Sequence, residues 1–226
     1  MVTLHFGHVQ GLEAEEQRKL QDLADVYQYH QSRNATKEKY YEGRVTLHDV
    51  NIGIALPREF SRFDVGCSWG QKAVDALAAR SMFDGFVGGG QAAEDVARIV
   101  AENRMIAEYA KACREELKYG CVFATLSADP KMLCRIRFHS PATSAALRSG
   151  EKGRIDCGMA IIDTVPDEKY KDMWRPHIVN LYTDDAVLVL TWDGSVWRAQ
   201  RHVHRMGRPL ICLLYTSPSP RDRSVS

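Results

Sequence analysis

Two short patterns in the sequence contain residue types that bind phosphate or metal. The glycine-rich run at residues 85–90 precedes an expected helix, where backbone N–H groups can hold a phosphate. Its spacing fits neither a dinucleotide-binding motif nor a P-loop, because no Lys-Ser or Lys-Thr pair follows it. His202 and His204 share one face of an expected strand, which suits zinc, but no third or fourth ligand is evident. We therefore interpret the glycines as a hinge and predict no cofactor and no metal site.

A candidate nucleophile lies near the start of another expected helix. The run GCSW at residues 66–69 resembles the papain-type cysteine, whose thiolate is stabilised at a helix N-terminus. In that family Trp directly follows the nucleophile, whereas here Ser68 separates it from Cys67. His139 and His177 could act as bases, but nothing in the sequence pairs either of them with Cys67. The chain also lacks GxSxG and HExxH motifs. We predict no catalytic residues, with a cytosolic thiol hydrolase using Cys67 as the alternative.

The N-terminal half has the periodicity of amphipathic helices. Apolar residues recur every three or four positions within residues 12–33, and early glutamates favour a helix N-terminus there. Helices are expected at about residues 12–33, 68–80, 92–100 and 104–118. The first helical region is expected to end at residues 40–43, with Gly43 as its left-handed C-terminal cap. In the second of them, the side chains expected to face inward are those of Trp69, Ala73, Val74 and Leu77. Residues 44–62, which contain Gly53 and Pro57, are expected to form an irregular connector.

The pattern then changes to the two-residue alternation of half-buried strands. Strands are expected at residues 121–127, 132–138, 155–163, 178–183, 186–192 and 196–204. Asp193-Gly194 is a strong signal for a tight hairpin between the last two strands. Helices followed by an antiparallel meander predict an α+β fold. We divide the chain into a helical part at residues 1–118 and an antiparallel β part at residues 119–210.

Composition excludes several classes of protein. The chain has 226 residues, of which 45% are hydrophobic and 26% charged, which is typical of a globular protein rather than a disordered one. No apolar stretch is long enough for a membrane helix, and residues 1–10 do not resemble a secretory signal. A net charge of +1 lacks the basic excess of a dedicated nucleic-acid binder. The six scattered cysteines are those expected of reduced thiols in a cytoplasm.

Residues 211–226 differ from the rest of the chain. They form a Ser/Pro/Arg-rich stretch with little to bury, which predicts a disordered tail without protection from hydrogen exchange. The run LLYTSPSPRDRS also resembles the translation of a sequencing-adapter read-through. We therefore expect the tail to be an artefact and the natural chain to continue differently after Leu210.

Six segments, in consistent order over roughly residues 15–210, resemble the portal proteins of tailed double-stranded DNA phages of the siphophage type. They are the YYEG run at residues 40–43, the WGQKAVDALAARSMFDGF run at 69–86, the helix at 99–117, the YGCVFA run at 119–124, the HSP turn at 139–141 and the HRMGRPL run at 204–210. The residues that match the family's motifs are Tyr40, Tyr41, Gly43, Trp69, Val74, Asp75, Leu77, Arg80, Gly85, Phe86, Asn103, Tyr119, Gly120, Ser140, Pro141, Gly207 and Pro209. We call them the signature residues.

The resemblance implies a structural protein rather than an enzyme. Its fold would be the portal wing, because the tunnel-lining helices, clip and crown of the family have no counterpart in this sequence. Full-length portals form a cyclic ring, which implies a dodecamer at the capsid vertex of the virion. The implied partners are the major capsid protein, scaffold, the terminase large subunit, head-completion proteins and double-stranded DNA, which passes through the ring without sequence specificity. A near-zero net charge agrees with a channel in which DNA must slide.

Overall fold

The computed structural model describes residue 4 and residues 6–48, 62–66, 68–150, 154–166 and 174–215, with the backbone alone at 45–48 and 62–66. It confirms the predicted α+β class, because the four described helices precede the antiparallel strands from residue 122 onward. The expected helices are α1 (Ala14–Tyr41), α2 (Trp69–Ala78), α3 (Gln91–Glu102) and α4 (Met105–Tyr119). Helix α1 ends at Tyr41 and Gly43 has a φ of 70°, which confirms the predicted end of this helical region at residues 40–43 with Gly43 as its left-handed cap.

The largest sheet has six strands in the order β1-β10-β9-β8-β7-β6. Their bounds are β1 (Val9–Gln10), β6 (Ser144–Arg148), β7 (Ile155–Pro166), β8 (Trp174–Tyr182), β9 (Ala186–Trp192) and β10 (Trp197–Val203). The neighbours are antiparallel, except that β1 lies parallel to β10. The predicted meander is confirmed for β7 to β10, whereas β1 and β6 were not foreseen. Gly194 has a φ of 102° in the hairpin between β9 and β10, as a tight turn there requires.

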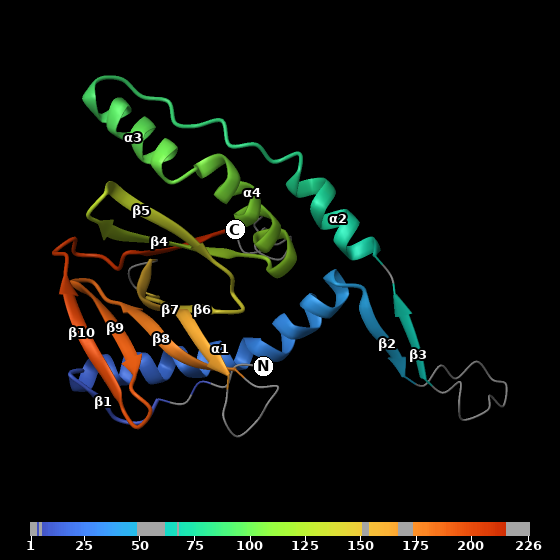
Figure 1. Cartoon of the computed structure of the whole chain (residues 1–226), viewed down its shortest axis with the longest axis horizontal. Coiled ribbons are helices and arrows are strands. Elements are labelled where there is room, and N and C mark those ends of the chain that lie inside the picture. Colours follow the sequence, from blue (N-terminus) through green and yellow to red (C-terminus); the bar gives the residue numbers. More distant parts are fainter. Residues whose placement is uncertain are drawn as a thin grey trace.

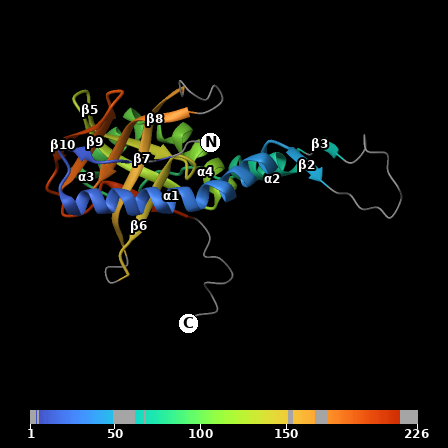
Figure 2. The same ribbon diagram turned by 90° about the horizontal axis from the view of Figure 1, so that it is seen from below.

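Helix α1 covers one face of this sheet, as Figure 2 shows from below. It starts with a capping box between Glu13 and Glu16, which satisfies backbone N–H groups that no helical carbonyl reaches. Its buried stripe packs with the inward side chains of the strands, and the fully buried members of this core include Leu20, Leu23, Tyr27, Met159, Leu181 and Leu188. Helix α1, from the predicted helical part at residues 1–118, thus shares a core with strands from the predicted β part at residues 119–210. The division at residue 118 stays a prediction.

A second sheet lies against the other face of the six-stranded sheet. It has the order β11-β4-β5, with β4 (Val122–Asp129), β5 (Met132–His139) and β11 (Ile211–Leu214). Phe123 and Ile211 from this sheet pack with Ala160 and Tyr182 from the larger one. Gly158 permits the approach, because a Cβ there would lie 2.8 Å from Cγ2 of Ile211.

The C-terminal strand corrects one prediction. Residues 211–214 were expected to lie outside the fold, but β11 pairs antiparallel with β4, and Ile211 is buried. The prediction is wrong for these four residues because β11 pairs with β4 and the Ile211 side chain fits the space over Gly158, which composition alone does not show. Residues 216–226 lie outside the described residues.

Helices α3 and α4 pack over β4 and β5, so α1, the larger sheet, the smaller sheet and this helix pair follow one another as layers (Figure 1). Helix α4 presents the predicted stripe, with Met105 and Cys113 buried and Tyr109 and Leu117 half-buried. Gly120 ends α4 with a φ of 93°, a backbone conformation that glycine adopts without strain.

Helix α2 and a strand pair project away from these layers (Figure 1). β2 (Arg44–His48) and β3 (Arg62–Gly66) are antiparallel, so the expectation of an irregular connector at 44–62 is wrong at its two ends. The predicted orientation of α2 is wrong for Ala73, which is exposed, and for Trp69 and Leu77, which are 79% and 54% exposed. Val74, the fourth side chain expected to face inward, is half-buried. Only Ala78 of α2 is buried, since the helix contacts α4 and the end of α1 through its other face.

Candidate functional site

The signature residues Tyr41, Asp75 and Tyr119 meet where α1, α2 and α4 come together. The Tyr41 hydroxyl donates to Oδ1 of Asp75 at 3.1 Å. The same oxygen accepts from Nε of Arg114 at 2.9 Å. The Tyr119 hydroxyl donates to Oε2 of Glu38, which lies one helical turn before Tyr41 on α1. We call this cluster, completed by Lys118, the α1–α2–α4 joint.

Lys118 is the central cation of the joint. Its side chain is only 8% exposed, and Nζ lies 2.6 Å from Oε2 of Glu38. The ammonium also stands 4.8 Å from the ring centroid of Tyr41 and 4.7 Å from that of Tyr119, which adds cation–π attraction. Burial favours the neutral amine, but the hydrogen bond to Glu38 and the charge of Glu115 outweigh it and raise the pKa of Lys118. The ammonium group of Lys118 therefore stays protonated at neutral pH.

The tyrosines of the joint stay protonated at neutral pH. Burial raises the pKa of Tyr119 to about 12, and its hydrogen bond to the Glu38 carboxylate acts in the same direction. Burial and the hydrogen bond to Asp75 also raise the pKa of Tyr41. A general acid or base works best with a pKa near the operating pH. These shifts move both hydroxyls away from that range, so the joint is suited to holding three helices together and not to proton transfer.

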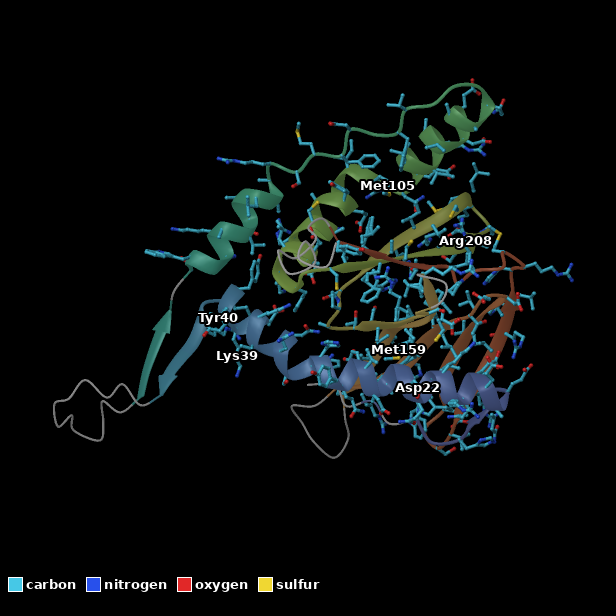
Figure 3. The ribbon with its side chains drawn as sticks, turned by 180° about the vertical axis from the view of Figure 1, so that it is seen from behind. Asp22, Lys39, Tyr40, Met105, Met159 and Arg208 are labelled. Carbon is cyan, nitrogen blue, oxygen red and sulfur yellow. The ribbon has the colours of Figure 1, made fainter. Side chains whose placement is uncertain are left out.

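An open groove of about 650 Å³ runs beside the joint. Figure 3 shows Tyr40 at the end of α1, where it lines this groove together with Val74 of α2. The two helices approach closely at Gly70, because a Cβ there would lie 2.8 Å from the carbonyl oxygen of Tyr40. The remaining lining residues are Ser32, Arg33, Thr36, Lys37, Tyr41, Leu117 and Lys118. This set contains cations and hydroxyl groups but neither a carboxylate nor a thiol.

The signature residue Asn103 connects the α3–α4 turn to the edge of the smaller sheet. Its Nδ2 donates to the carbonyl oxygen of Cys134 at 2.7 Å, and its Oδ1 accepts from the backbone N–H of Ile136 at 2.7 Å. Nδ2 also donates to the carbonyl oxygen of Ile99 at 2.9 Å. Since β5 is an outer strand, the Asn103 amide takes the place of the next strand's backbone over one residue pair.

The signature turn Ser140-Pro141 is held by the middle of α1. Nδ2 of Asn34 donates to the carbonyl oxygen of Pro141 at 3.1 Å, and the Tyr27 hydroxyl donates to that of Ala142 at 2.9 Å. Burial raises the pKa of Tyr27 well above its usual range, so this hydroxyl remains a donor at neutral pH. Within the turn, the Ser140 hydroxyl accepts from the N–H of Ala142 at 3.2 Å.

The other signature residues lie apart from one another. Gly43, Gly85 and Gly207 are at turns with positive φ, and Pro209 is buried before β11. Trp69, Leu77, Arg80 and Phe86 are exposed on α2 and the segment that follows it. The signature residues therefore do not converge on one pocket. Where they contact one another or other parts of the fold, they do so at junctions between elements.

Sequence reasoning did not single out Glu38, Arg114 or Lys118, the charged residues of the joint. The sequence indicates them only through spacing: Arg114 and Lys118 are four residues apart on one helix face. They precede Tyr119 by five residues and by one residue. Surface charges with this spacing are common on helices, so the pattern alone does not indicate a buried cation.

The candidate metal and nucleophile residues occupy separate places. His202 is exposed, whereas Nδ1 of His204 accepts from the backbone N–H of Met206 at 3.1 Å. Across the part of the chain that the structure describes, no three His, Cys, Asp or Glu side chains are grouped to hold a metal ion. Cys67, the nucleophile of the alternative hypothesis, lies outside the described residues.

The histidines proposed as bases are already engaged. A ring nitrogen of His139 lies 2.9 Å from the Thr125 hydroxyl. Burial and the nearby Arg137 charge lower the pKa of His139 to about 4. Nδ1 of His177 in β8 lies 3.0 Å from Oδ2 of Asp163 in the neighbouring strand β7. Burial also raises the pKa of the thiols of Cys121 and Cys134, and it raises that of Cys157 to about 12. These three thiols are therefore not activated as nucleophiles.

No protein-family model matches the chain, and no curated protein matches it significantly. Among the described helices, none is long and apolar enough to cross a membrane. The function must therefore be argued from the signature segments and from the geometry given above.

Proposed function

We propose that this chain is part of a phage portal protein and acts as a structural subunit of the ring at the capsid vertex. The proposal rests on the six signature segments and their order along the chain. In this role the ring is the conduit for DNA packaging and ejection and the docking site for terminase and head-completion proteins. Assembly would take place in the bacterial host cytoplasm, and the mature location would be the virion.

One structural observation carries the proposal furthest. Signature segments that are far apart in sequence are bonded to one another, through Tyr41 with Asp75 and through Tyr119 with Glu38 beside the YYEG run. Asn103 and the Ser140-Pro141 turn likewise connect elements instead of lining a pocket. In a structural subunit, the residues fixed by a family's motif are expected at such junctions. In an enzyme they are expected around a reacting group.

The charge of the chain is compatible with this role. With a net charge of +1, the chain has no general excess of cations to hold DNA phosphates. The cations at the joint are engaged: Lys118 pairs with Glu38, Arg114 pairs with Asp75, and Lys37 donates to the carbonyl oxygen of Tyr119. A ring whose cations are neutralised internally lets DNA pass without strong binding.

The test compares this chain with the product of the uninterrupted parent gene. We expect the parent product to form closed rings in light scattering and electron microscopy, because ring closure needs heterologous contacts along the whole subunit. Residues 1–215 alone are expected to form no closed ring, and this boundary keeps β11 intact. A parent product that stays monomeric under capsid-assembly conditions contradicts the proposal.

The hydrolase alternative has its own test. Hydrolysis of an ester substrate by the wild-type chain that disappears in Cys67→Ser would establish the alternative and overturn the structural role. We expect no turnover by either protein. Cys212→Ser is the matched control, because this thiol is exposed on the short outer strand β11.

A further inference from the structure

Helix α2 contacts the fold through the face that carries Asp75 and the small apolar residues Val74 and Ala78. Asp75 points inward to Tyr41 and Arg114, whereas Trp69, Ala73 and Leu77 form an exposed apolar stripe with four-residue spacing. Amphipathic helices normally bury the apolar stripe. An aromatic residue that is 79% exposed on such a stripe marks a surface that another molecule covers. We call the stripe of Trp69, Ala73 and Leu77 the ridge.

A complementary concave surface lies on the same chain. Residues 85–89 and one face of α3 enclose a groove of about 440 Å³. Its α3 side is formed by the small side chains of Ala92, Ala93, Val96, Ala97 and Val100. The lining contains no charged side chain, and three of its residues are glycines without side chains to fill it. We call this surface the groove.

The connector that leads to the groove is anchored on α4. The Phe83 ring packs against Tyr109 with 5.6 Å between centroids, and Phe86 stands edge-on to Phe83 at 5.5 Å. The contacts of Phe83 and Phe86 therefore fix the start of residues 85–89 on α4, and this segment then lies along α3. The groove is thus present without any partner in place.

The charges around the two surfaces are opposite. Beside the ridge, the exposed cation Lys72 follows Trp69 by three positions on α2, and Arg80, which is also exposed, lies two residues after the helix ends at Ala78. Helix α3 carries Glu94, Asp95 and Glu102 against one cation, Arg98, which gives it a net charge of −2. Contact between ridge and groove would therefore pair a basic flank with an acidic helix.

We propose that the ridge of one copy of this chain docks into the groove of the next copy. The ridge and the groove lie at opposite ends of the connector between α2 and α3, so the contact joins two different surfaces (Figure 1). A contact of this heterologous kind generates a ring when the rotation closes. The choice of a second copy as occupant rests on the proposed ring-forming function together with the opposite charges. Trp69 is the expected main contributor, because a buried Trp is the commonest type of residue to dominate an interface.

The contact involves one helix face and one short groove. Interfaces below about 1,200 Å² are typical of weak association. We therefore expect the 226-residue chain alone to associate weakly, with a mass that rises with concentration and falls with added salt. A stable closed ring would need further contacts from the parent protein.

The test uses two variants that each remove one side of the contact. Trp69→Ala removes the ridge, and Ala97→Trp fills the groove at a position that is already exposed. In sedimentation velocity over a concentration series, we expect each variant to associate at least roughly tenfold more weakly than wild type. Tyr29→Ala is the matched control, because Tyr29 is 80% exposed on α1 and belongs to neither surface. It should associate like wild type.

Mixing the two variants gives the decisive result. The intact ridge of Ala97→Trp can dock into the intact groove of Trp69→Ala, so an equimolar mixture should form a 1:1 dimer that cannot grow. Circular dichroism and unfolding midpoints close to wild type ensure that both variants are folded. A monomeric mixture, a wild-type chain that does not associate, or variants that associate like wild type each overturn the contact.

The contact and the proposed function fail in different ways. If the parent product forms rings that Trp69→Ala leaves unchanged, the contact is wrong while the portal proposal stands. If the mixed variants form the 1:1 dimer but the parent product forms no ring, the contact stands and the portal proposal is wrong.

Discussion

Replacing Asn103 should be among the most destabilising polar substitutions in this chain. The side chain is 9% exposed and makes hydrogen bonds to the backbones of Cys134, Ile136 and Ile99 at 2.7, 2.7 and 2.9 Å. Asn103→Leu keeps the approximate volume but leaves a carbonyl and an N–H of β5 without partners. Each net hydrogen bond contributes about 1 kcal/mol, and a buried group left unpaired costs about 1–3 kcal/mol.

The position of β5 sets where in that range the effect falls. Cys134 and Ile136 are half-buried on an outer strand, so water can reach part of the exposed edge once the amide is gone. We therefore expect a loss of about 2–3 kcal/mol in the free energy of unfolding. For a chain of this size that corresponds to a decrease of roughly 4–12 °C in Tm.

Urea unfolding combined with hydrogen exchange measures this effect. The Ile136 amide should exchange faster in Asn103→Leu than in wild type, because its acceptor is lost. Glu102→Ala is the matched control: its carboxylate accepts from the exposed N–H of Leu133 at 3.2 Å, and its loss should change stability by less than about 0.5 kcal/mol. If Asn103→Leu unfolds within about 0.5 kcal/mol of wild type and protection of Ile136 is unchanged, the reasoning is refuted.

Three further substitutions test other parts of the fold. Gly194→Val should lower stability by about 1–2 kcal/mol through backbone strain alone, since φ is 102° and no atom lies within 4 Å of the added Cβ; an unchanged unfolding midpoint contradicts a tight hairpin. Gly158→Ala should destabilise by crowding Ile211, and adding Ile211→Ala should recover part of the loss, so strictly additive effects in a double-mutant cycle contradict the packing of β11. Because the pKa of His139 is lowered to about 4 by burial and by Arg137, the unfolded chain binds its proton first as the pH falls. Stability should therefore decrease from about pH 6.5 to pH 4, and His139→Gln should reduce this slope in pH-dependent urea unfolding.

The sequence predicted well those elements whose signals are local. β9 has the bounds expected from its alternation, Ala186–Trp192, and the Asp193-Gly194 turn lies where the two-residue signal placed it. The register of this hairpin places Trp192 opposite Trp197, so the four residues 193–196 lie between the paired positions and the loop is longer than the two-residue signal predicts. Helix α4 agrees with its prediction, as β9 does, because one face carries an uninterrupted four-residue stripe.

Elements that depend on distant partners were not predictable in the same way. β11 is four residues long, and its place in the fold comes from the absence of a side chain at Gly158. Gln31 and Asn34 of α1 are buried, and they donate hydrogen bonds to the carbonyl oxygens of Ala142 and Pro141. Polar residues count against burial in a periodicity argument, so the sequence did not indicate that these two positions face the fold.

The junctions were out of reach for a related reason. Asn103 was singled out by family resemblance, but nothing local indicates that its amide pairs with β5. Lys118 was not singled out at all, although its side chain is almost fully buried. The partners of both residues come from segments far along the chain, and a single sequence does not contain that information.

The orientation of α2 shows what amphipathic periodicity does and does not establish. The pattern identified the apolar face of the helix correctly, and the error was to assume that this face has its partner in the same chain. The ion pair between Asp75 and Arg114, which attaches the other face, is 39% and 44% exposed at its two side chains. Such a pair contributes about 0–1 kcal/mol, and α2 buries only Ala78 besides. Helix α2 should therefore open more readily than α1 or the six-stranded sheet. Any partner that covers Trp69 must slow hydrogen exchange in α2 first, because that helix has the least stability of its own.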